Sequence, residues 1–455
     1  MRAADILVAI VLGAVLVNPS AVAIEIPGNH GNPQAVQEVV AGERTVANAA
    51  WWGFNEEDAT EALQSAIDSG ATRVIVPNMT RDWIVRPITL AGDQELVLEE
   101  GVVVTAKRGE YRGGGDTVLT ARDVANLTLR GYGATVRMHK KDYIVGKVLV
   151  DFDWERWYGQ YKKAEWRSGL ALLGCTNVAV AGLTIRDTGG DGIYIDGAST
   201  QEHCRDVRLR DVVCDENYRQ GISIISVEGM LVENCAFNNT WGTPPSAGVD
   251  IEPDSAEDTV KNVVFRNCLF EDNYGDGIEV YPLHMSGEAG DITVLFENCR
   301  VTSRHGPGIR VSKVPETAPA GLIEFRNCVV ENTQGYGIKV QDKSANLARV
   351  RFVSCIVRNA GNSPNWYTQF EGARSPIWLH LFRPELTEKL GGIDFVDCVV
   401  EDDRDRPVIV VEETDSDFGI FDITGTVTVR NPYGVKTRLG EKQHEVTLVV
   451  KESGS

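Results

Sequence analysis

Charged and polar side chains recur at one position of a short repeated pattern in this chain of 455 residues. The pattern is a glycine, an apolar residue, a variable residue and a second apolar residue, and its glycines follow one another at steps of 27 to 31 residues. The variable position holds, in chain order, Tyr194, Ser223, Asp250, Glu279, Arg310 and Lys339. Apolar residues on both sides of a variable residue indicate strand alternation, so we expect these side chains to form one solvent-facing column.

Two carboxylates of this column, Asp250 and Glu279, fall in consecutive repeats, and Glu252 follows Asp250 on the same face. Stacked parallel strands lie about 4.8 Å apart, and alternate residues of one strand about 6.5–7 Å apart. Carboxylates this close repel one another, which raises the pKa of at least one and leaves a protonated acid beside an ionised partner. Glycoside hydrolysis uses such a pair, at about 5 Å for retention and about 6.5–9.5 Å for inversion. We predict Asp250, Glu252 and Glu279 as the catalytic set, with both stereochemical outcomes open.

Other residues on or beside this face are predicted to bind the substrate. Cations could hold a hydroxyl or carboxylate group of a sugar, and aromatic rings could stack on sugar rings. The predicted binding set is Tyr194, Asp196, Tyr281, His284, Arg310, Lys339, Trp378 and His380.

Two other interpretations of the same residues stay open. The oxygen ligands of Asp250, Glu252, Asp254 and Glu279 could bind Ca²⁺, in which case the ion would neutralise a uronate and Lys339 or Arg310 would abstract its C5 proton. That chemistry belongs to a polysaccharide lyase or a uronate epimerase, whereas the hydrolase needs no cofactor. Alternatively, the charges form a surface ion-pair ladder, as in a non-catalytic glycan-binding or surface protein.

The repeat itself predicts the fold. A fixed period of about 30 residues indicates a solenoid, in which each repeat buries its apolar face on its neighbours. This length fits three short strands with turns, the geometry of a right-handed parallel β-helix. Residues 58–70 show the apolar spacing of a short helix, which we expect to cap the open N-terminal end.

Nine cysteines in an exported protein would suggest disulfides, but their positions do not. Six of them occupy one place in the repeat: Cys235, Cys268, Cys299, Cys328, Cys355 and Cys398. A strand position that recurs once per coil forms an inward column, where cysteine acts as a small apolar filler. We therefore predict buried free thiols.

Composition and the N-terminal residues limit the partners and the location. A net charge of −20 argues against nucleic acid, because phosphate binding needs clustered Lys and Arg. Residues 1–23 resemble a secretory signal, with Arg2, an apolar run over 6–17 and the small residues Ala21-Val22-Ala23. We expect a secreted or periplasmic protein without a membrane span, acting on a polysaccharide or oligosaccharide. The oligomeric state stays open.

The domain organisation follows from these segments. We expect a signal peptide over 1–23, an irregular segment over 24–50 and one β-helix domain over 51–455. Aromatic-rich stretches interrupt the repeat at about 151–167 and at 361–392.

A family resemblance supports the same fold. Thr60–Asp68, Val74-Ile75-Val76-Pro77 and Leu96–Gly101 resemble the opening of the pectin-lyase-like β-helix superfamily, as does Leu170–Val178 with Gly182–Ile185. That superfamily includes polygalacturonases and related hydrolases, polysaccharide lyases and uronate epimerases.

The polygalacturonase motifs are only partly present. Asp191-Gly192-Ile193 resembles the end of the polygalacturonase Asn-Thr-Asp-Gly motif, whereas Gln220 stands where these enzymes carry a paired Asp. The resemblance implies that a substrate would lie along the outward strand face.

Overall fold

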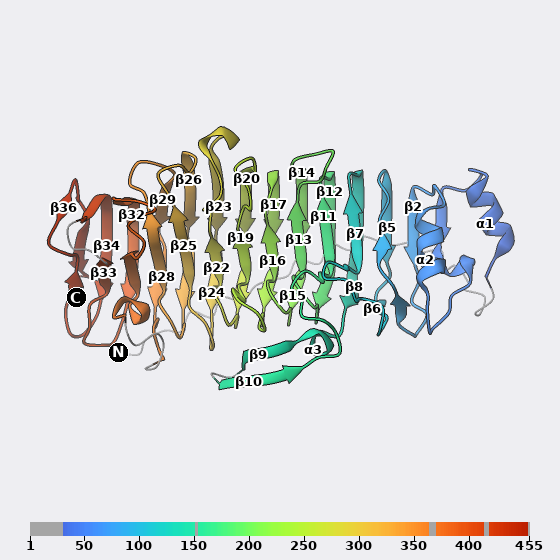
Figure 1. Cartoon of the computed structure of the whole chain (residues 1–455), viewed down its shortest axis with the longest axis horizontal. Helices are drawn as coiled ribbons and strands as arrows, with labels where there is room; N and C mark the ends of the chain where they lie inside the picture. The colour runs from blue at the N-terminus through green and yellow to red at the C-terminus, as the bar shows by residue number, and fades with distance from the viewer. Residues whose placement is uncertain (1–30, 151–152, 364–369, 414–417, 454–455) are drawn as a thin grey trace, which may run out of the picture.

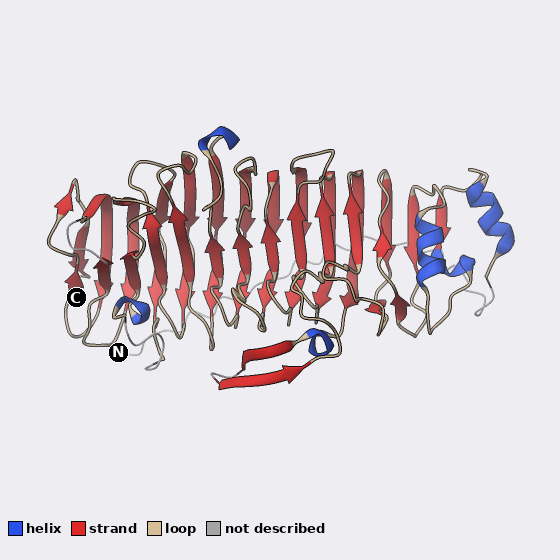
Figure 2. Ribbon diagram, in the orientation of Figure 1, coloured by secondary structure: helices blue, strands red, loops and turns tan. Residues whose placement is uncertain are grey.

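The computed structural model describes residues 31–455 except 151–152, 364–369, 414–417 and 454–455. The predicted signal peptide, residues 1–23, lies outside the described residues. The chain winds into an elongated parallel β-helix with helices at its N-terminal end, as Figures 1 and 2 show. No helix in the described part of the chain is long and apolar enough to cross a membrane.

The sheet that carries the predicted column, called sheet B here, is parallel and has 12 described strands. In spatial order they are β4 (Ile88–Thr89), β7 (Leu119–Arg122), β11 (Leu170–Leu173), β13 (Ile193–Asp196), β16 (Ile222–Ile224), β19 (Val249–Ile251), β22 (Ile278–Val280), β25 (Ile309–Val314), β28 (Ile338–Lys343), β31 (Ile377–Leu381), β33 (Ile409–Glu413) and β35 (Thr437–Arg438).

The remaining coil strands form a second parallel arrangement, sheet A, which bends around the other faces of the solenoid. Its described strands are β1 (Val46–Asn48), β2 (Arg73–Val76), β3 (Trp83–Val85), β5 (Gln94–Leu98), β6 (Val103–Ala106), β8 (Ala125–Arg137), β12 (Thr176–Arg186), β14 (Cys204–Arg210), β15 (Val213–Asp215), β17 (Val227–Glu233), β18 (Ala236–Asn238), β20 (Val260–Arg266), β21 (Leu269–Glu271), β23 (Ile292–Glu297), β24 (Arg300–Thr302), β26 (Gly321–Arg326), β27 (Val329–Glu331), β29 (Arg349–Val353), β30 (Ile356–Arg358), β32 (Leu390–Glu401), β34 (Ile420–Arg430), β36 (Gln443–His444) and β37 (Val449–Glu452). A regular coil such as β16–β17–β18 therefore has the three predicted strands.

Close approach between coils explains the repeated glycine. A Cβ on Gly221 would lie 2.4 Å from the carbonyl oxygen of Gly248, and a Cβ on Gly248 would lie 2.6 Å from that of Gly277. Any side chain would therefore push neighbouring coils apart at the start of each sheet B strand.

The interior is packed by columns of identical residues. Phe265, Phe296, Phe325, Phe352 and Phe395 stack in sequence, with ring centroids 4.8 to 5.3 Å apart. All nine cysteines are buried and free, which confirms the predicted thiol column. Stacked coils thus supply the apolar burial that a single coil cannot provide.

Helices cover the N-terminal end, where α2 (Thr60–Ile67) buries Ala62, Leu63, Ala66 and Ile67, as predicted. Residues 24–50, by contrast, were expected to be irregular, and in their described part this expectation is wrong. They contain α1 (Pro33–Val40), begin the 3₁₀ helix η1 (Ala49–Trp52) and provide β1, which pairs with β2 as the first coil strand. The Asn32 side chain caps α1, and Pro33 begins it.

The first interruption of the coils is an antiparallel hairpin. After α3 (Lys140–Tyr143), strands β9 (Val145–Val150) and β10 (Asp153–Tyr158) form the hairpin, which lies outside the stacked coils in Figure 1. The interruption therefore starts before the predicted boundary at 151. Two further 3₁₀ turns, η2 (Gly287–Ala289) and η3 (Gly372–Arg374), lie in loops, and η3 and β31 both lie inside the predicted interruption at 361–392.

Candidate functional site

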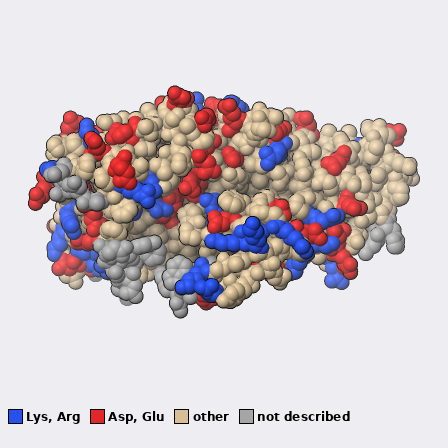
Figure 3. Space-filling view, viewed as in Figure 1, with Lys and Arg blue, Asp and Glu red and all other residues tan. Residues whose placement is uncertain are grey.

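The sheet B register places the predicted column residues side by side. Successive strands pair Tyr194, Ser223, Asp250, Glu279, Arg310, Lys339 and Trp378 in that order. The structure thus confirms that Asp250 and Glu279 are direct neighbours. Figure 3 shows acidic side chains gathered over the middle strands of this face.

The central part of the column is not open to solvent, which corrects the expectation of an exposed face. Asp250 is 1% exposed, Glu279 3%, Lys339 7% and Trp378 3%. Their side chains do point outward from sheet B, but neighbouring side chains enclose them, and at Trp378 the second interrupting segment contributes Phe370 and Ala373 to this packing. Burial of ionisable groups has a high desolvation cost, so the partners of each group decide its charge.

Asp250 is buried and held by an amide side chain. Gln220 Nε2 donates a hydrogen bond of 2.7 Å to Asp250 Oδ2, whereas Oδ1 is buried without a hydrogen-bond partner in the described structure. Burial, and then the charges of Glu279 and Glu252, raise the pKa of Asp250 well above its ordinary value. Asp250 therefore ionises less readily than an ordinary aspartate.

Glu252 is the member of the predicted catalytic set that reaches the surface, because 31% of its side chain is exposed. Burial and the nearby Glu279 raise its pKa, while the Arg219 guanidinium, 3.6 Å away, lowers it. Arg219 also lies 3.5 Å from Asp191, whose pKa burial raises to about 6.

Arg310 holds Glu279 together with a second carboxylate. Its Nη2 lies 2.5 Å from Glu279 Oε2, and its Nε lies 3.0 Å from Asp276 Oδ2. The Tyr336 hydroxyl donates a hydrogen bond of 2.6 Å to Asp276 Oδ1. Burial raises the pKa of Asp276 to about 6, against the opposing effect of Arg310. These contacts place Asp276 and Tyr336 in the site as well.

A cavity of about 640 Å³ lies over the second half of the column. Arg310, Lys339, Trp378 and His380 contribute to its lining, and so does Asp276. Its other lining residues include Val145, Gly146 and Lys147 of β9, the 242–246 loop, and Phe370 and Phe382 of the second interrupting segment. Asp250, Glu252 and Glu279 do not line it, so the cavity adjoins the carboxylate cluster without containing it.

Lys339 is an unusual cation in this cavity. Its ammonium lies 3.9 Å from the ring centroid of Trp378 and 5.5 Å from that of Tyr336, and no carboxylate of the described residues lies within ion-pair distance. Burial, and then the positive charge of Arg310, lower the pKa of Lys339 to about 7. The amine can therefore gain or lose a proton near neutral pH.

Trp378 and His380 support Lys339 more than they offer a surface for stacking. Their rings stack at 4.5 Å with an interplanar angle of 19°, and Trp378 is almost completely buried. Burial, and then Lys339, lower the pKa of His380 to about 3, so its imidazole is neutral. The prediction that the Trp378 ring stacks on a sugar ring at an exposed surface does not fit this packing.

The remaining predicted binding residues lie outside the cavity. Tyr194 donates a hydrogen bond of 3.0 Å to Asp196, and burial raises the pKa of both groups. Tyr281 is half-buried and packs against Lys313, at 4.9 Å from the ring centroid. His284 is exposed in the loop after β22. These residues flank the carboxylate cluster instead of completing it.

Metal ligation is a separate question for Asp250, Glu252, Asp254 and Glu279. Within the described chain no three His, Cys, Asp or Glu side chains converge as a group that could hold a metal ion. The cationic partners of Glu252 and Glu279 are arginines, and Asp254 lies exposed in a turn capped by Asp258. Because this donor set does not fit Ca²⁺, the mechanism proposed below contains no metal step.

The predicted site did not include five residues that the structure places there: Asp191, Arg219, Gln220, Asp276 and Tyr336. Asp191 and Gln220 entered the sequence analysis only through the polygalacturonase resemblance. All five lie at or just before the repeated glycine, as in Asp191-Gly192 and Asp276-Gly277, so a second column at that position was the available signal.

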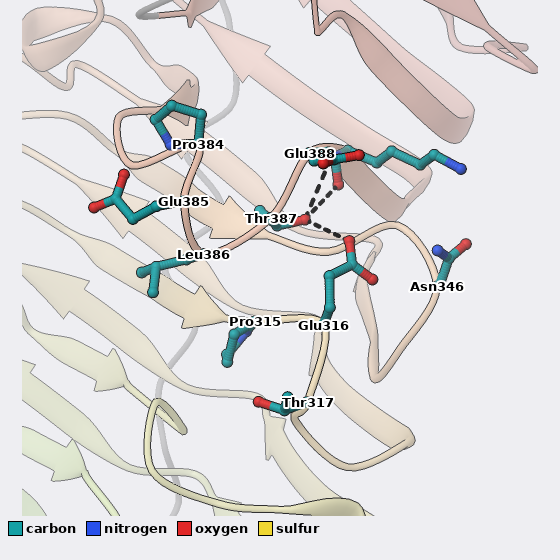
Figure 4. A pocket seen from close by; sticks show the side chains of 10 residues that line it. Pro315, Glu316, Thr317, Asn346, Pro384, Glu385, Leu386, Thr387 and Glu388 are labelled. Atoms are coloured by element: carbon teal, nitrogen blue, oxygen red, sulfur yellow. Dashed lines mark hydrogen bonds between the residues drawn. The ribbon is translucent and has the colours of Figure 1, made fainter.

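A second cavity, of about 680 Å³, lies elsewhere and is shown in Figure 4. It lies between the 315–317 loop, which follows β25, and residues 384–389. Thr387 donates a hydrogen bond of 2.9 Å to the exposed Glu316 across it. None of the predicted catalytic or binding residues lines this cavity.

Comparison with known proteins agrees with the architecture. A family model described as a right handed beta helix region matches residues 162–288 and 288–372. The uncharacterized protein YclG of Bacillus subtilis (strain 168) is 29% identical over 145 residues, a match covering 29% of this chain and 25% of YclG. The chain thus spans about a quarter of the length of that curated relative.

Two solved structures cover most of the chain. The A-module of the Azotobacter vinelandii mannuronan C-5 epimerase AlgE6 superposes with a TM-score of 0.61 and 14% identity, over 90% of this chain and 100% of that one. The Yersinia enterocolitica family 28 exopolygalacturonase superposes with a TM-score of 0.52 and 15% identity, over 90% and 78%. At this identity the likeness shows the fold alone, a right-handed parallel β-helix, as predicted.

Proposed function

We propose that this right-handed parallel β-helix protein is an enzyme that cleaves glycosidic bonds of a polysaccharide by hydrolysis. The observation that carries the proposal is the cluster of Asp250, Glu252 and Glu279, in which a buried carboxyl group with a raised pKa, a partly exposed carboxyl group and an arginine-paired carboxyl group are neighbours. The fold shared with a polygalacturonase and an epimerase supports a glycan as substrate.

The geometry suggests a role for each carboxyl group. Glu252, partly exposed and with a raised pKa, is the general acid that protonates the leaving oxygen. The guanidinium of Arg219, 3.6 Å away, stabilises the charge that then forms on Glu252, and Asp250 is the buried carboxyl group on the same strand face. Glu279 is the second carboxylate, and it becomes accessible when a substrate group takes over the contact with Arg310.

A second candidate is β-elimination or C5 epimerisation of a uronate, and Lys339 favours it. A buried amine with a pKa of about 7, facing a cavity, has the properties of a base for abstraction of a C5 proton. An acidic sugar in the cavity would place its carboxylate near Arg310 and Lys339. Both reactions imply export to a secreted or periplasmic location, where such polysaccharides occur.

Product analysis separates the candidates. Native protein, Glu252→Gln and Glu279→Gln would be incubated with neutral and acidic polysaccharides. Glu61→Gln is the control, because the Glu61 side chain is 93% exposed and lies on α2, far from the carboxylate cluster in the chain. Hydrolysis predicts new reducing ends without ultraviolet absorbance from unsaturated sugars, with a loss of about 10²-fold or more in the two site variants.

Other outcomes would change the assignment. Unsaturated ends that persist in Glu252→Gln and vanish in Lys339→Met would move it to the lyase. A changed uronate configuration without chain cleavage would move it to the epimerase. Binding without any product from any polysaccharide would refute catalysis and leave a glycan-binding protein.

A further inference from the structure

A buried cation that takes no part in the proposed reaction lies at the base of the hairpin. Lys140, the first residue of α3, is 2% exposed, and its ammonium lies 3.7 Å from the ring centroid of Trp241. The ammonium also donates a hydrogen bond of 3.1 Å to the carbonyl oxygen of Asn217 and lies 3.6 Å from Glu216 Oε2. Because burial of an ammonium is costly, these contacts must compensate for its lost hydration.

The contacts of Lys140 join the hairpin to two turns of the solenoid. Glu216 and Asn217 lie in the turn before β16, and Trp241 lies in the turn before β19. The two turns are also bound to each other, because the backbone N–H of Trp241 donates to the same carbonyl oxygen of Asn217, at 3.1 Å. The indole N–H of Trp241 donates a hydrogen bond of 2.6 Å to Glu216 Oε2. One ammonium thus lies where three segments of the chain meet.

The same three segments lead directly into the lining of the cavity of about 640 Å³. Asn217 precedes the lining residue Tyr218, and Trp241 precedes the lining loop 242–246. On the hairpin side, α3 leads into β9, whose lining residues are Val145, Gly146 and Lys147. The contacts of Lys140 therefore fix where β9 stands relative to the two turns.

An apolar cluster at this junction supports the same arrangement. Ile144 and Tyr218 are fully buried and pack with Trp157 of β10 and with Trp241. The two indole rings meet edge to face, with centroids 5.9 Å apart. Gly242 lies so close to Tyr218 that a Cβ on it would be 2.1 Å from the ring. The base of the hairpin is thus packed on the coils, and its first strand forms a wall of the cavity.

We propose that the hairpin is a recognition wall for the sugar units next to the cleaved bond, and that Lys140 is the positioning residue that holds it in place. This inference rests on the proposed hydrolysis, because the carboxylate cluster adjoins the cavity without lining it. A sugar chain that extends from the cluster into the cavity contacts β9 at its three lining residues. The exposed ammonium of Lys147 and the backbone of β9 offer polar groups to the sugar hydroxyl or acidic groups there.

Lys140→Ala tests this role, because it removes the cation–π contact, the hydrogen bond and the ion pair together. Lys141→Ala is the matched control, since Lys141 is the next residue of α3, is exposed, and lies over Trp157 of the hairpin itself. The first readout needs no activity and is hydrogen–deuterium exchange of the backbone amides of α3 and the hairpin. A two-stranded hairpin without its anchor is only marginally stable, so this exchange should become about ten-fold faster or more. The control should exchange like the native protein.

The second readout is kinetic and separates recognition from a merely structural role. If the native protein hydrolyses a glycan, KM of Lys140→Ala should rise about ten-fold or more, with kcat within about two-fold of the native value. An unchanged KM would overturn the recognition role, whatever happens to kcat. Native-like exchange of the hairpin in Lys140→Ala would overturn the positioning role.

A binding measurement keeps the inference testable if the native protein hydrolyses nothing, a result that would refute the proposed function. Oligosaccharides made by partial acid hydrolysis of the same neutral and acidic polysaccharides would be added during the exchange experiment. At least one of them should slow exchange of the amides of residues 145–147 about three-fold or more in the native protein, and not in Lys140→Ala. No protection by any of these oligosaccharides would overturn the inference.

Trp241→Leu covers the case in which Lys140→Ala does not fold. It removes the ring beneath the ammonium and keeps an apolar side chain, so the same faster exchange and higher KM are expected. Native-like exchange of the hairpin in this variant would also overturn the inference.

Discussion

Replacement of Lys339 by methionine gives a quantitative test of the buried amine. Burial and Arg310 lower the pKa of Lys339 from 10.5 to about 7, a difference that corresponds to about 5 kcal/mol at 1.36 kcal/mol per pH unit. Methionine has a similar length and no charge. It removes the cost of burying the ammonium, together with the contact on Trp378, which stabilises by about 1–2 kcal/mol.

The direction of the pH dependence follows from proton binding. Between pH 7 and 10.5 the unfolded chain binds more protons at this amine than the folded chain does, so the free energy of unfolding of the native protein rises with pH across this window. Below pH 7 both states are protonated and the full cost is present. The free energy of unfolding of Lys339→Met should therefore exceed that of the native protein by about 3–4 kcal/mol at pH 6. Above pH 7 this difference should shrink by up to about 1.4 kcal/mol per pH unit, because the native protein becomes more stable.

Urea unfolding followed by circular dichroism at pH 6, 7, 8 and 9 measures this difference for the native protein and Lys339→Met. Lys451→Met, at an exposed position of β37, is the control and should show no such trend. A difference between native protein and Lys339→Met that stays constant from pH 6 to 9 would refute the reasoning, because it would mean that Lys339 titrates alike in both states.

Two further predictions concern the core and the cavity. Phe325→Ala should lower the free energy of unfolding by about 3–5 kcal/mol. The reason is that the Phe325 ring is fully buried between Phe296 and Phe352, with ring-centroid distances of 5.1 and 5.0 Å. A loss below about 1 kcal/mol in urea unfolding would contradict this stacking. Tyr336→Phe removes the hydroxyl that donates to Asp276 Oδ1, a bond to a charged group of about 1.5–3 kcal/mol, so the pKa of Asp276 should rise from about 6 by about one to two pH units. Carboxyl ¹³C NMR checks it, and an unshifted titration would show that the hydroxyl does not stabilise the ionised form.

The repeat could be predicted because its causes are local and periodic. Gly221 and Gly248 recur since each coil start passes close to the carbonyl oxygen of the next, and Cys268 and Cys299 recur because each fills the same inward place. Such a period predicts the stacking register, so that the neighbouring positions of Asp250 and Glu279 followed from the sequence.

The environment of the column could not be predicted in the same way. Whether Asp250 and Lys339 face water depends on side chains that come from other coils and from segments without a period, such as the hairpin and the loop before β31. The N-terminal helix α1 was not predicted either, and only Ala35 and Val39 of its eight residues are buried.

The sequence by itself thus determined the solenoid, its thiol column and the order of charged residues along sheet B, because one coil repeats the contacts of the last. Only the tertiary structure decided which of those residues are buried, paired or protonated. Arg310 lies between Glu279 and Asp276, Gln220 holds Asp250, and Lys339 has no carboxylate partner in the described structure. Charge states of this kind depend on three-dimensional burial and on distances of a few ångströms, which a one-dimensional period does not specify.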